Sequence, residues 1–400
     1  MILRGKHILY LYFFLWIVYE LQELLGLSGS ALSLCAILVI NAISIFYCIK
    51  LNRLVHDMPI YFKALNIMIL LFTLYGIIYC LDGEHYMILV KEENPYNYLK
   101  TIYNSLLPIY VFSYFSWKGV LTRRMMCIFG CLFFIMVFLS YWGYDLKMKS
   151  ILLERGGDRD GFVNNMGYEF LCLFPILTFY YKRPIFQYLG VICVMTFILM
   201  GMKRGAILIG FFCMVWFLLE MFKSAKNFKK LIIILTSIGV VVLLFFLVWH
   251  LLMTSDFFRM RIQSTIEGNV SGRSYLYTIL LNYFLYDTNA FQFFFGSGAN
   301  ATLEVSFNYA HNDWLEILVN QGVLGFCAYL FYWISFFMAW RKTERTDNMR
   351  LAMGLLFFIY FMRTFFSMSY GNMNIYSTSV LGVCLGNIIR SSSFSKGSSL

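Results

Sequence analysis

The chain has 400 residues, of which 60% are hydrophobic, and its mean hydropathy is +0.70. Its 32 basic and 21 acidic side chains are too few to cover a soluble protein of this size with a charged surface. The composition therefore excludes an ordinary soluble enzyme and predicts a chain that lies in lipid. In such a chain we take the net charge of +11 as a sign of membrane orientation and not of nucleic-acid binding.

Apolar runs of about 20 residues, the length that crosses a bilayer as a helix, recur along the whole chain. Arg4 and Lys6 precede the first run, but no small-x-small cleavage site follows before Glu20, so we expect this run to stay as a span. We predict an all-α polytopic membrane protein with about twelve transmembrane helices. The expected spans lie at about 7–25, 29–49, 64–81, 98–116, 125–143, 165–181, 185–202, 205–222, 231–252, 321–340, 351–368 and 374–389.

Basic residues gather at alternate connections between these runs. One set of connections and the two ends carry 20 of the 32 basic residues and 4 of the 21 acidic ones, a net charge of +16. The other set carries the remaining 12 basic and 17 acidic residues, a net charge of −5. Because Lys and Arg favour the cytoplasmic side of a membrane, both termini are predicted to be cytoplasmic.

The connections on the predicted outer face differ in length. Residues 82–97 are acidic, 144–164 are rich in glycine and charge, and 201–204 form a tight turn, whereas 253–312 run for about 60 residues. Loops of that length usually bind or catalyse. We therefore expect a single integral membrane domain over residues 1–400, with a functional outer loop at 253–312.

Four arginines stand on the predicted outer face or within a span: Arg159, Arg204, Arg273 and Arg363. Each taken alone could be an anchor that snorkels to the membrane surface. Taken together, guanidinium groups next to glycines on a face poor in positive charge indicate a site for an anion, and phosphate suits the planar guanidinium fork.

His311 lies where the long loop re-enters the membrane, in the run YAHNDWLEILVNQGVLG. Asn312 is placed to cap a helix that begins near Asp313, and Gly322 and Gly325 offer a small face for close helix contact. A histidine at a helix start can be an incidental surface residue, but an imidazole is also the commonest general base.

The sequence predicts no metal and no cofactor. Asp158 and Asp160 have the DxD spacing of metal-using sugar transferases, but the soluble nucleotide-binding domain of those enzymes is missing. The five histidines form no HxH or HxxxH pair, and the ten cysteines form no CxxC pair. Gly296-Ser297-Gly298 is not followed by the lysine of a phosphate-binding loop.

These residues resemble the signature region of the bacterial O-antigen ligase and O-antigen polymerase superfamily. The resemblance rests on Gly296-x-Gly298 and on His311-Asn312 with Leu315, Leu318, Gly322 and Gly325. It implies a GT-C-like membrane fold with about twelve spans and a large periplasmic loop, here 253–312, before the signature histidine.

Earlier segments are similar to further motifs of that superfamily. Met202-Lys203-Arg204-Gly205-Ala206 looks like its short arginine turn, Ser271-Gly272-Arg273 like its loop arginine, and Gly161-Phe162-Val163-Asn164-Asn165 like a looser Gly/Asn-rich segment. Lys203 and Asn320 depart from the pattern, since a small hydroxyl residue and an acid are common at those positions. The resemblance covers residues 155–326 by motif and the remainder by topology alone.

The resemblance implies transfer of a glycan from undecaprenyl pyrophosphate at the periplasmic face of the bacterial inner membrane. Arg204 and Arg273 are expected to hold the pyrophosphate, and His311 is expected to take the proton from the acceptor hydroxyl in a metal-independent inverting reaction. The other substrate-contacting candidates are Arg159, Asn165, Asn312 and Arg363. Expected partners are the undecaprenyl-pyrophosphate-linked oligosaccharide, membrane lipid and a chain-length regulator protein, with no nucleic acid.

Three functions remain open at this point. We favour an O-antigen or capsule polymerase, because the His-Asn-x-x-Leu signature and the following Gly-x-x-Gly are intact and nothing marks a core-oligosaccharide site. The alternatives are a ligase that transfers the glycan to lipid A-core and a flippase for lipid-linked oligosaccharides. The lack of a visible internal repeat and the concentration of charge in outer loops count against a transporter.

Overall fold

The computed structural model describes residues 2–82, 87–88, 91–92, 95–154, 162–224, 228–267, 273–344, 348–367, 370 and 372–397. Almost all of these residues are helical, which confirms the predicted all-α polytopic membrane protein. The elements are α1 (Ile2–Glu20), α2 (Ala31–Leu54), α3 (Ile60–Asp82), β1 (Met87–Ile88), β2 (Lys91–Glu92), α4 (Pro95–Leu106), α5 (Pro108–Trp117), α6 (Arg123–Glu154), α7 (Gly167–Leu171), α8 (Phe174–Leu177), η1 (Thr178–Tyr180), α9 (Pro184–Met200), α10 (Arg204–Ser224), α11 (Phe228–Thr254), α12 (Asp256–Ile266), α13 (Arg273–Asn282), η2 (Tyr283–Asp287), α14 (Ala290–Phe295), α15 (Ala301–Ser306), α16 (Asp313–Lys342), α17 (Met349–Phe366) and α18 (Ile375–Gly397).

In the described part of the chain, seven helices are long and apolar enough to cross a membrane: α2, α3, α6, α10, α11, α16 and α17. Each corresponds to one predicted span, and helix also covers the other predicted runs. Two of those runs are divided. The run at 98–116 breaks at Leu107, before Pro108, and the run at 165–181 breaks before the short helix that contains Pro175. Proline lacks a backbone N–H and crowds the preceding turn, so it ends a helix at these positions.

Contacts between Cα atoms group the chain into two compact units. Unit 1 holds residues 1–43, 115–268 and 344–359, and unit 2 holds residues 44–114, 269–343 and 360–400. Each unit takes in segments that are far apart in the sequence, so its packing depends on long-range contacts.

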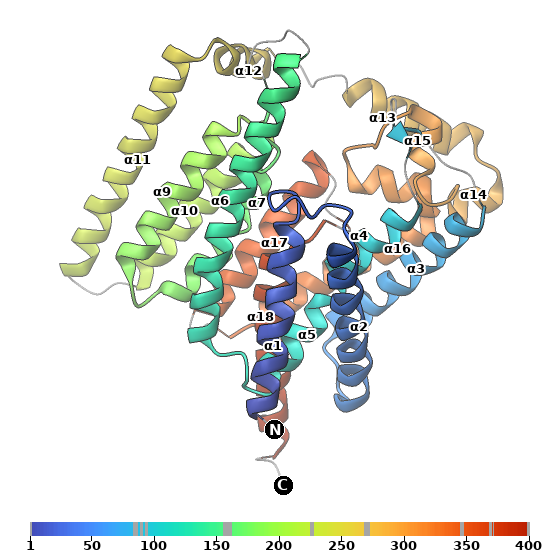
Figure 1. Ribbon diagram of the computed structural model, residues 1–400, viewed down its shortest axis with the longest axis horizontal. Helices are drawn as coiled ribbons and strands as arrows, with labels where there is room; N and C mark the ends of the chain where they lie inside the picture. The colour runs from blue at the N-terminus through green and yellow to red at the C-terminus, as the bar shows by residue number, and fades with distance from the viewer. Residues whose placement is uncertain are drawn as a thin grey trace. The chain divides into compact units, whose positions relative to one another are not determined.

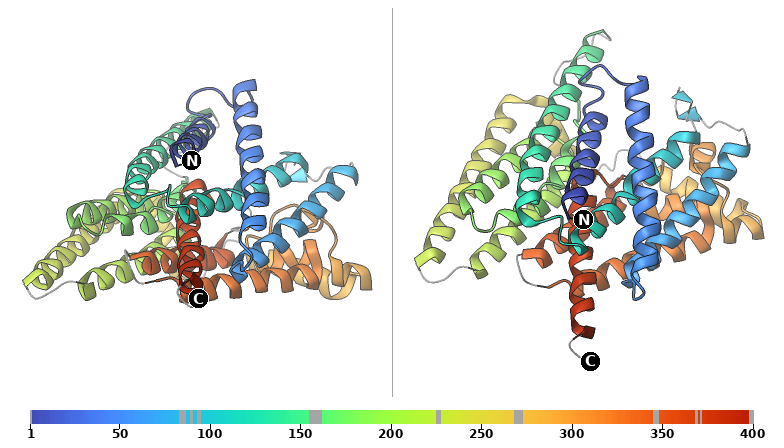
Figure 2. Two further views of the ribbon diagram at one scale, coloured as in Figure 1. Left: turned by 90° about the horizontal axis from the view of Figure 1, so that it is seen from below. Right: turned by 60° about the horizontal axis from the view of Figure 1, so that its bottom comes forward.

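Unit 1 is built on α6, α9, α10 and α11. Helices α9, α10 and α11 lie side by side (Figures 1 and 2), and Phe170 of α7 stacks on Phe197 of α9 with ring centroids 4.8 Å apart. Gly130 lets α6 approach α8, because a Cβ there would lie 2.7 Å from a methyl carbon of Ile176. Small residues at such contacts are a common means of packing helices within a membrane.

Unit 2 is built on α3 and α16, which pack along one another. The hydroxyl groups of Tyr61 and Tyr332 lie 2.8 Å apart and join the two helices. Helix α18 packs closely on α5, since a Cβ on Gly382 would lie 2.5 Å from the Cβ of Phe112.

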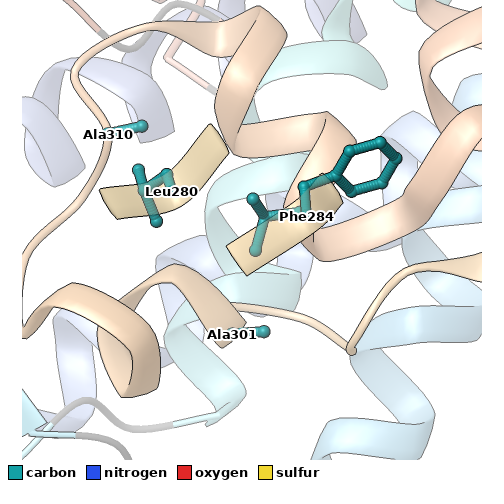
Figure 3. Packing of buried hydrophobic residues seen from close by; sticks show 5 residues of the cluster. Leu280, Phe284, Ala301 and Ala310 are labelled. Carbon is teal, nitrogen blue, oxygen red and sulfur yellow. The ribbon is translucent and has the colours of Figure 1, made fainter. Parts of the chain in front are cut away.

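Residues 253–312, predicted as one long outer loop, carry four short α-helices and a π-helical turn in their described parts, 253–267 and 273–312. Helix α12 belongs to unit 1, whereas α13, η2, α14 and α15 belong to unit 2. A small core of Leu280, Phe284, Ala301, Ala310 and Val319 joins α13, η2 and α15 to α16 (Figure 3). The part of the loop from α13 onward therefore packs into a small core that it shares with α16.

Candidate active site

The start of α16 forms the centre of the candidate site in unit 2. Asn312 is the N-cap, and its side-chain oxygen accepts hydrogen bonds from the backbone N–H groups of Trp314 (3.0 Å) and Leu315 (3.3 Å). This confirms the predicted cap and the helix start at Asp313. Because the amide oxygen of Asn312 is used in capping, the residue fixes the direction in which the chain leaves His311.

His311 itself has a backbone φ of +52°, in the left-handed region that residues other than glycine rarely adopt. Its side chain is half-buried. Such a conformation costs on the order of 1–3 kcal/mol and persists only where the surrounding structure holds it. The contacts on both sides of His311 supply that support.

Glu316, one turn into α16, is completely buried and holds the segment before His311. Its carboxylate accepts a hydrogen bond from the backbone N–H of Ala310 at 2.7 Å and others from the Thr302 hydroxyl and the Asn320 amide. Ala310 directly precedes His311, so this carboxylate sets the backbone position of the histidine. Glu316 is not among the residues predicted from the sequence, although an acid in an otherwise apolar run is a signal for such a role.

Asp313 is also completely buried and holds the other side of His311. Its Oδ2 atom accepts hydrogen bonds from the Tyr329 hydroxyl at 2.6 Å and from the backbone N–H of Tyr370 at 3.1 Å. Burial raises the pKa of the Tyr370 phenol well above its ordinary value, and the nearby charge of Glu316 adds to that rise. Tyr370 therefore stays a neutral phenol beside the two carboxylates.

A break in α16 at Gly322 supports the same region. Gly322 has φ +66° and ψ −165°, and the carbonyls of Val319 and Asn320 accept hydrogen bonds from the N–H groups of Ser297 (2.9 Å) and Gly298 (3.0 Å). A Cβ on Gly322 would lie 2.6 Å from the carbonyl carbon of Phe294. The glycine predicted to let two helices meet thus receives the end of α14, and the loop Gly296-Ser297-Gly298 that follows α14 binds the break.

Arg273 begins α13 and is half-buried. One turn later Leu276 packs against the core that contains Leu280 and Ala310, the residue before His311 (Figure 3). Arg273 and His311 therefore lie in the same unit, and the segments that carry them meet in this core through Leu276 and Ala310.

Arg363 is buried in α17, with 4% of its surface exposed. Its guanidinium carbon lies 5.0 Å from the ring centroid of Tyr360. The adjacent Thr364 accepts a hydrogen bond from the indole N–H of Trp314 at 2.9 Å, which ties this end of α17 to the start of α16. A guanidinium inside an apolar span is costly, so its retention there is typical of a functional group.

A small cavity lies between these groups. Its lining includes Phe72, Tyr329, Trp333, Tyr360 and Tyr370. The volume is about 20 Å³, which is room for about one water molecule. The cavity is too small for a sugar. Its lining includes Tyr360, whose ring contacts Arg363, and Tyr329 and Tyr370, which both donate hydrogen bonds to Asp313.

The predicted arginine turn lies in unit 1. Arg204 begins α10 and is half-buried, after a turn in which Met202 has φ +52°. The backbone of Asn164 pairs with this turn, since its N–H donates to the Gly201 carbonyl at 3.0 Å. Lys203 Nζ donates to the side-chain oxygen of Asn165 at 2.8 Å.

The structure thus groups the predicted residues into two sets. Arg204 and Asn165 lie together in unit 1, joined through Lys203, and Arg273, His311, Asn312 and Arg363 lie in unit 2. Arg159, Asp158 and Asp160 lie outside the described residues. Within the described part of the chain, no group of three or more His, Cys, Asp or Glu side chains is placed to hold a metal ion.

The sequence was compared with known protein families and proteins. Residues 189–330 match the model of a family described as O-antigen ligase, a range that contains Arg204, Arg273 and His311. No curated protein matched the chain. The family match confirms, for the segment that carries these three residues, the resemblance to the O-antigen ligase and polymerase superfamily.

Proposed function

We propose that this multi-pass membrane protein is a glycosyltransferase that polymerises oligosaccharide repeat units carried on undecaprenyl pyrophosphate at the periplasmic face of the inner membrane. The observation that carries the proposal is the family match, because it supports membrane glycan processing of the ligase or polymerase kind and spans Arg204, Arg273 and His311. Both kinds of reaction use a lipid-linked glycan.

In the proposed reaction His311 is the general base. Its imidazole accepts the proton of the acceptor hydroxyl while the hydroxyl oxygen attacks the anomeric carbon of the donor sugar. The bond from that carbon to the pyrophosphate oxygen breaks, and the electron pair leaves on the pyrophosphate. A single displacement of this kind inverts the configuration at the anomeric carbon.

Arg204 and Arg273 are proposed to bind the donor pyrophosphate and to offset the negative charge that grows as it leaves. Guanidinium groups suit this role because they form paired hydrogen bonds with phosphate oxygens and stay charged at all relevant pH values. Arg159, Asn165 and Arg363 are proposed as further substrate contacts, and Asn312 as the residue that orients His311.

The geometry around His311 supports a base held in one position. Buried carboxylates fix the backbone before and after it, through Ala310 and through the start of α16. A preorganised base loses little entropy in reaching the acceptor hydroxyl. A ligase that transfers glycan to lipid A-core is the second candidate, because the matching family is described as O-antigen ligase.

The test uses purified protein in lipid nanodiscs with a defined undecaprenyl-pyrophosphate oligosaccharide, in the presence of a metal chelator. A polymerase forms longer lipid-linked products from the donor alone, and a chain-length regulator added afterwards should change their length distribution. A ligase forms product only when lipid A-core is added. Failure to consume donor under either condition, by protein that is folded and monodisperse, would contradict the proposal.

A further inference from the structure

The segment from Leu281 to Phe295, here named the aromatic elbow, exposes a run of large apolar side chains. It comprises the last two residues of α13, the turn η2, and α14. Six of its side chains are between 42% and 79% exposed: Leu281, Leu285, Tyr286, Phe291, Phe294 and Phe295. Large exposed apolar patches of this kind usually mark a surface that binds a membrane or another protein.

The elbow lies beside two membrane-spanning helices. The Tyr75 hydroxyl of α3 donates a hydrogen bond to the carbonyl of Phe295, and α14 packs on α16 where the helix breaks at Gly322. Tyr75 lies six residues before Leu81, the end of the spanning part of α3, which is about 9 Å along a helix. The elbow is therefore level with the outer turns of a span.

The neighbouring surface of α3 has the same character. Leu74, Ile77, Ile78 and Leu81 are exposed apolar residues of this spanning helix; Leu74 directly precedes Tyr75 and the other three follow it within six residues. The elbow thus lies beside an exposed apolar surface of a helix long and apolar enough to cross a membrane.

Both ends of α14 have backbone groups that are satisfied within the protein. Asn289 and Gln292 form a reciprocal cap, in which each side chain accepts a hydrogen bond from the backbone N–H of the other. At the far end the Gly296 N–H donates to the Gln292 carbonyl at 2.6 Å, while Tyr75 satisfies the carbonyl of Phe295. Internal satisfaction of backbone groups is a requirement for segments that enter lipid.

We propose that the aromatic elbow is an interfacial membrane anchor, with its phenylalanine and tyrosine rings among the headgroups and outer acyl chains of the leaflet at the end of α3. Aromatic side chains favour that depth of a bilayer, where an apolar ring and a polar edge are both accommodated. The elbow would then lie in the membrane surface, whereas the loop predicted at 253–312 was expected to project into water. This inference concerns membrane contact and does not rest on the proposed reaction.

The experiment places a single environment-sensitive fluorophore, NBD, on a variant without the ten native cysteines. Phe291→Cys and Tyr286→Cys report on the elbow, and Glu304→Cys on the exposed polar side of α15 is the matched control. In phosphatidylcholine nanodiscs the elbow probes should emit at shorter wavelength and lose fluorescence to 5-doxyl lipid. The Glu304 probe should lose fluorescence to aqueous iodide.

Two results would overturn the proposal. If iodide quenches the elbow probes as strongly as the Glu304 probe, the elbow lies in water. If neither quencher acts and the emission changes only when two protein copies share a disc, a second copy covers the elbow.

If the cysteine-free variant does not fold, benzoylphenylalanine at position 291 in the otherwise native chain provides the second measurement. Irradiation in membranes should then give adducts with the mass of a phospholipid. An adduct only with a second copy of the chain, or no adduct at all, would contradict the inference.

Discussion

Around the start of α16, two buried carboxylates hold the backbone on both sides of His311, whereas the contacts of the arginine turn before α10 include a backbone pair between Asn164 and Gly201 and the partly exposed side chain of Lys203. Glu316 and Asp313 are fully buried and accept at least five hydrogen bonds between them. The contact from Lys203 to Asn165 lies at the surface. The difference suits the two proposed roles. A general base such as His311 must be held in one position relative to the acceptor hydroxyl, whereas the charge of Arg204 can attract pyrophosphate over a wider range of distances and angles.

Among the variants that leave His311 in place, the largest effect is expected from removal of either arginine that is proposed to bind phosphate. Arg204→Ala and Arg273→Ala should each lower turnover by ~10²- to 10³-fold, because each loses a group that stabilises charge in the transition state. Product formation with a defined donor measures the effect. Arg259→Ala is the control, since that arginine pairs with Asp256 on the exposed face of α12, and an equal loss there would mean that the effect is general and not due to the proposed site.

Glu316→Gln should have the next largest effect. The substitution keeps the size of the side chain but replaces one of the two carboxylate oxygens, which accept from Ala310, Thr302 and Asn320, with an amide NH₂ donor. An amide group that faces those donors leaves at least one of them unsatisfied, at a cost of about 1–3 kcal/mol.

Turnover should fall while donor affinity, measured by a binding assay in nanodiscs, stays close to that of the native protein. A variant that loses donor affinity and turnover in equal proportion would show that Glu316 does not act through His311.

Gly322→Ala should destabilise unit 2 by about 1–3 kcal/mol, because alanine is strained at φ +66° and its Cβ would lie 2.6 Å from the Phe294 carbonyl carbon. Thermal unfolding in detergent measures the change. Gly239→Ala in α11 is the matched control, since a Cβ there meets nothing within 4 Å and alanine favours helix by about 1 kcal/mol. If both variants unfold at the same temperature as the native protein, the break in α16 at position 322 does not require glycine.

Lys203→Ala should have the smallest effect. It removes one partly exposed hydrogen bond to Asn165, worth about 0.5–1.5 kcal/mol at most. The apparent KM for donor should rise a few-fold with little change in kcat, as steady-state assays over a range of donor concentrations can show. A collapse of kcat would mean that Lys203 takes part in the reaction and that the turn is as tightly coupled as the start of α16.

The sequence was most informative where the structural cause is local. The apolar runs predicted the positions of the helices, and Asn312 before Asp313 predicted the cap of α16, because both depend on residues within a few positions of each other. Pro108 and Pro175 were visible local signals for the divided spans, but the spans were nonetheless predicted as continuous.

Contacts over long sequence distances could not be predicted in the same way. Gly296 and Gly322 meet across 26 positions, and the partner of Asp313 at Tyr370 lies 57 positions away. Glu316 was detectable as an acid in an apolar run, but its partners at Thr302 and Ala310 come from a loop whose folding the sequence does not indicate. The placement of Arg273 and His311 in one unit depends on the same loop.

The most direct test of the account compares His311→Ala with the native protein in a single-turnover assay with a defined undecaprenyl-pyrophosphate oligosaccharide. The account predicts that donor affinity stays within a few-fold of the native value and that transfer slows by ~10²- to 10⁴-fold, the usual contribution of a general base. Transfer at a near-native rate by the folded variant would contradict the assignment of His311 and with it the proposed reaction.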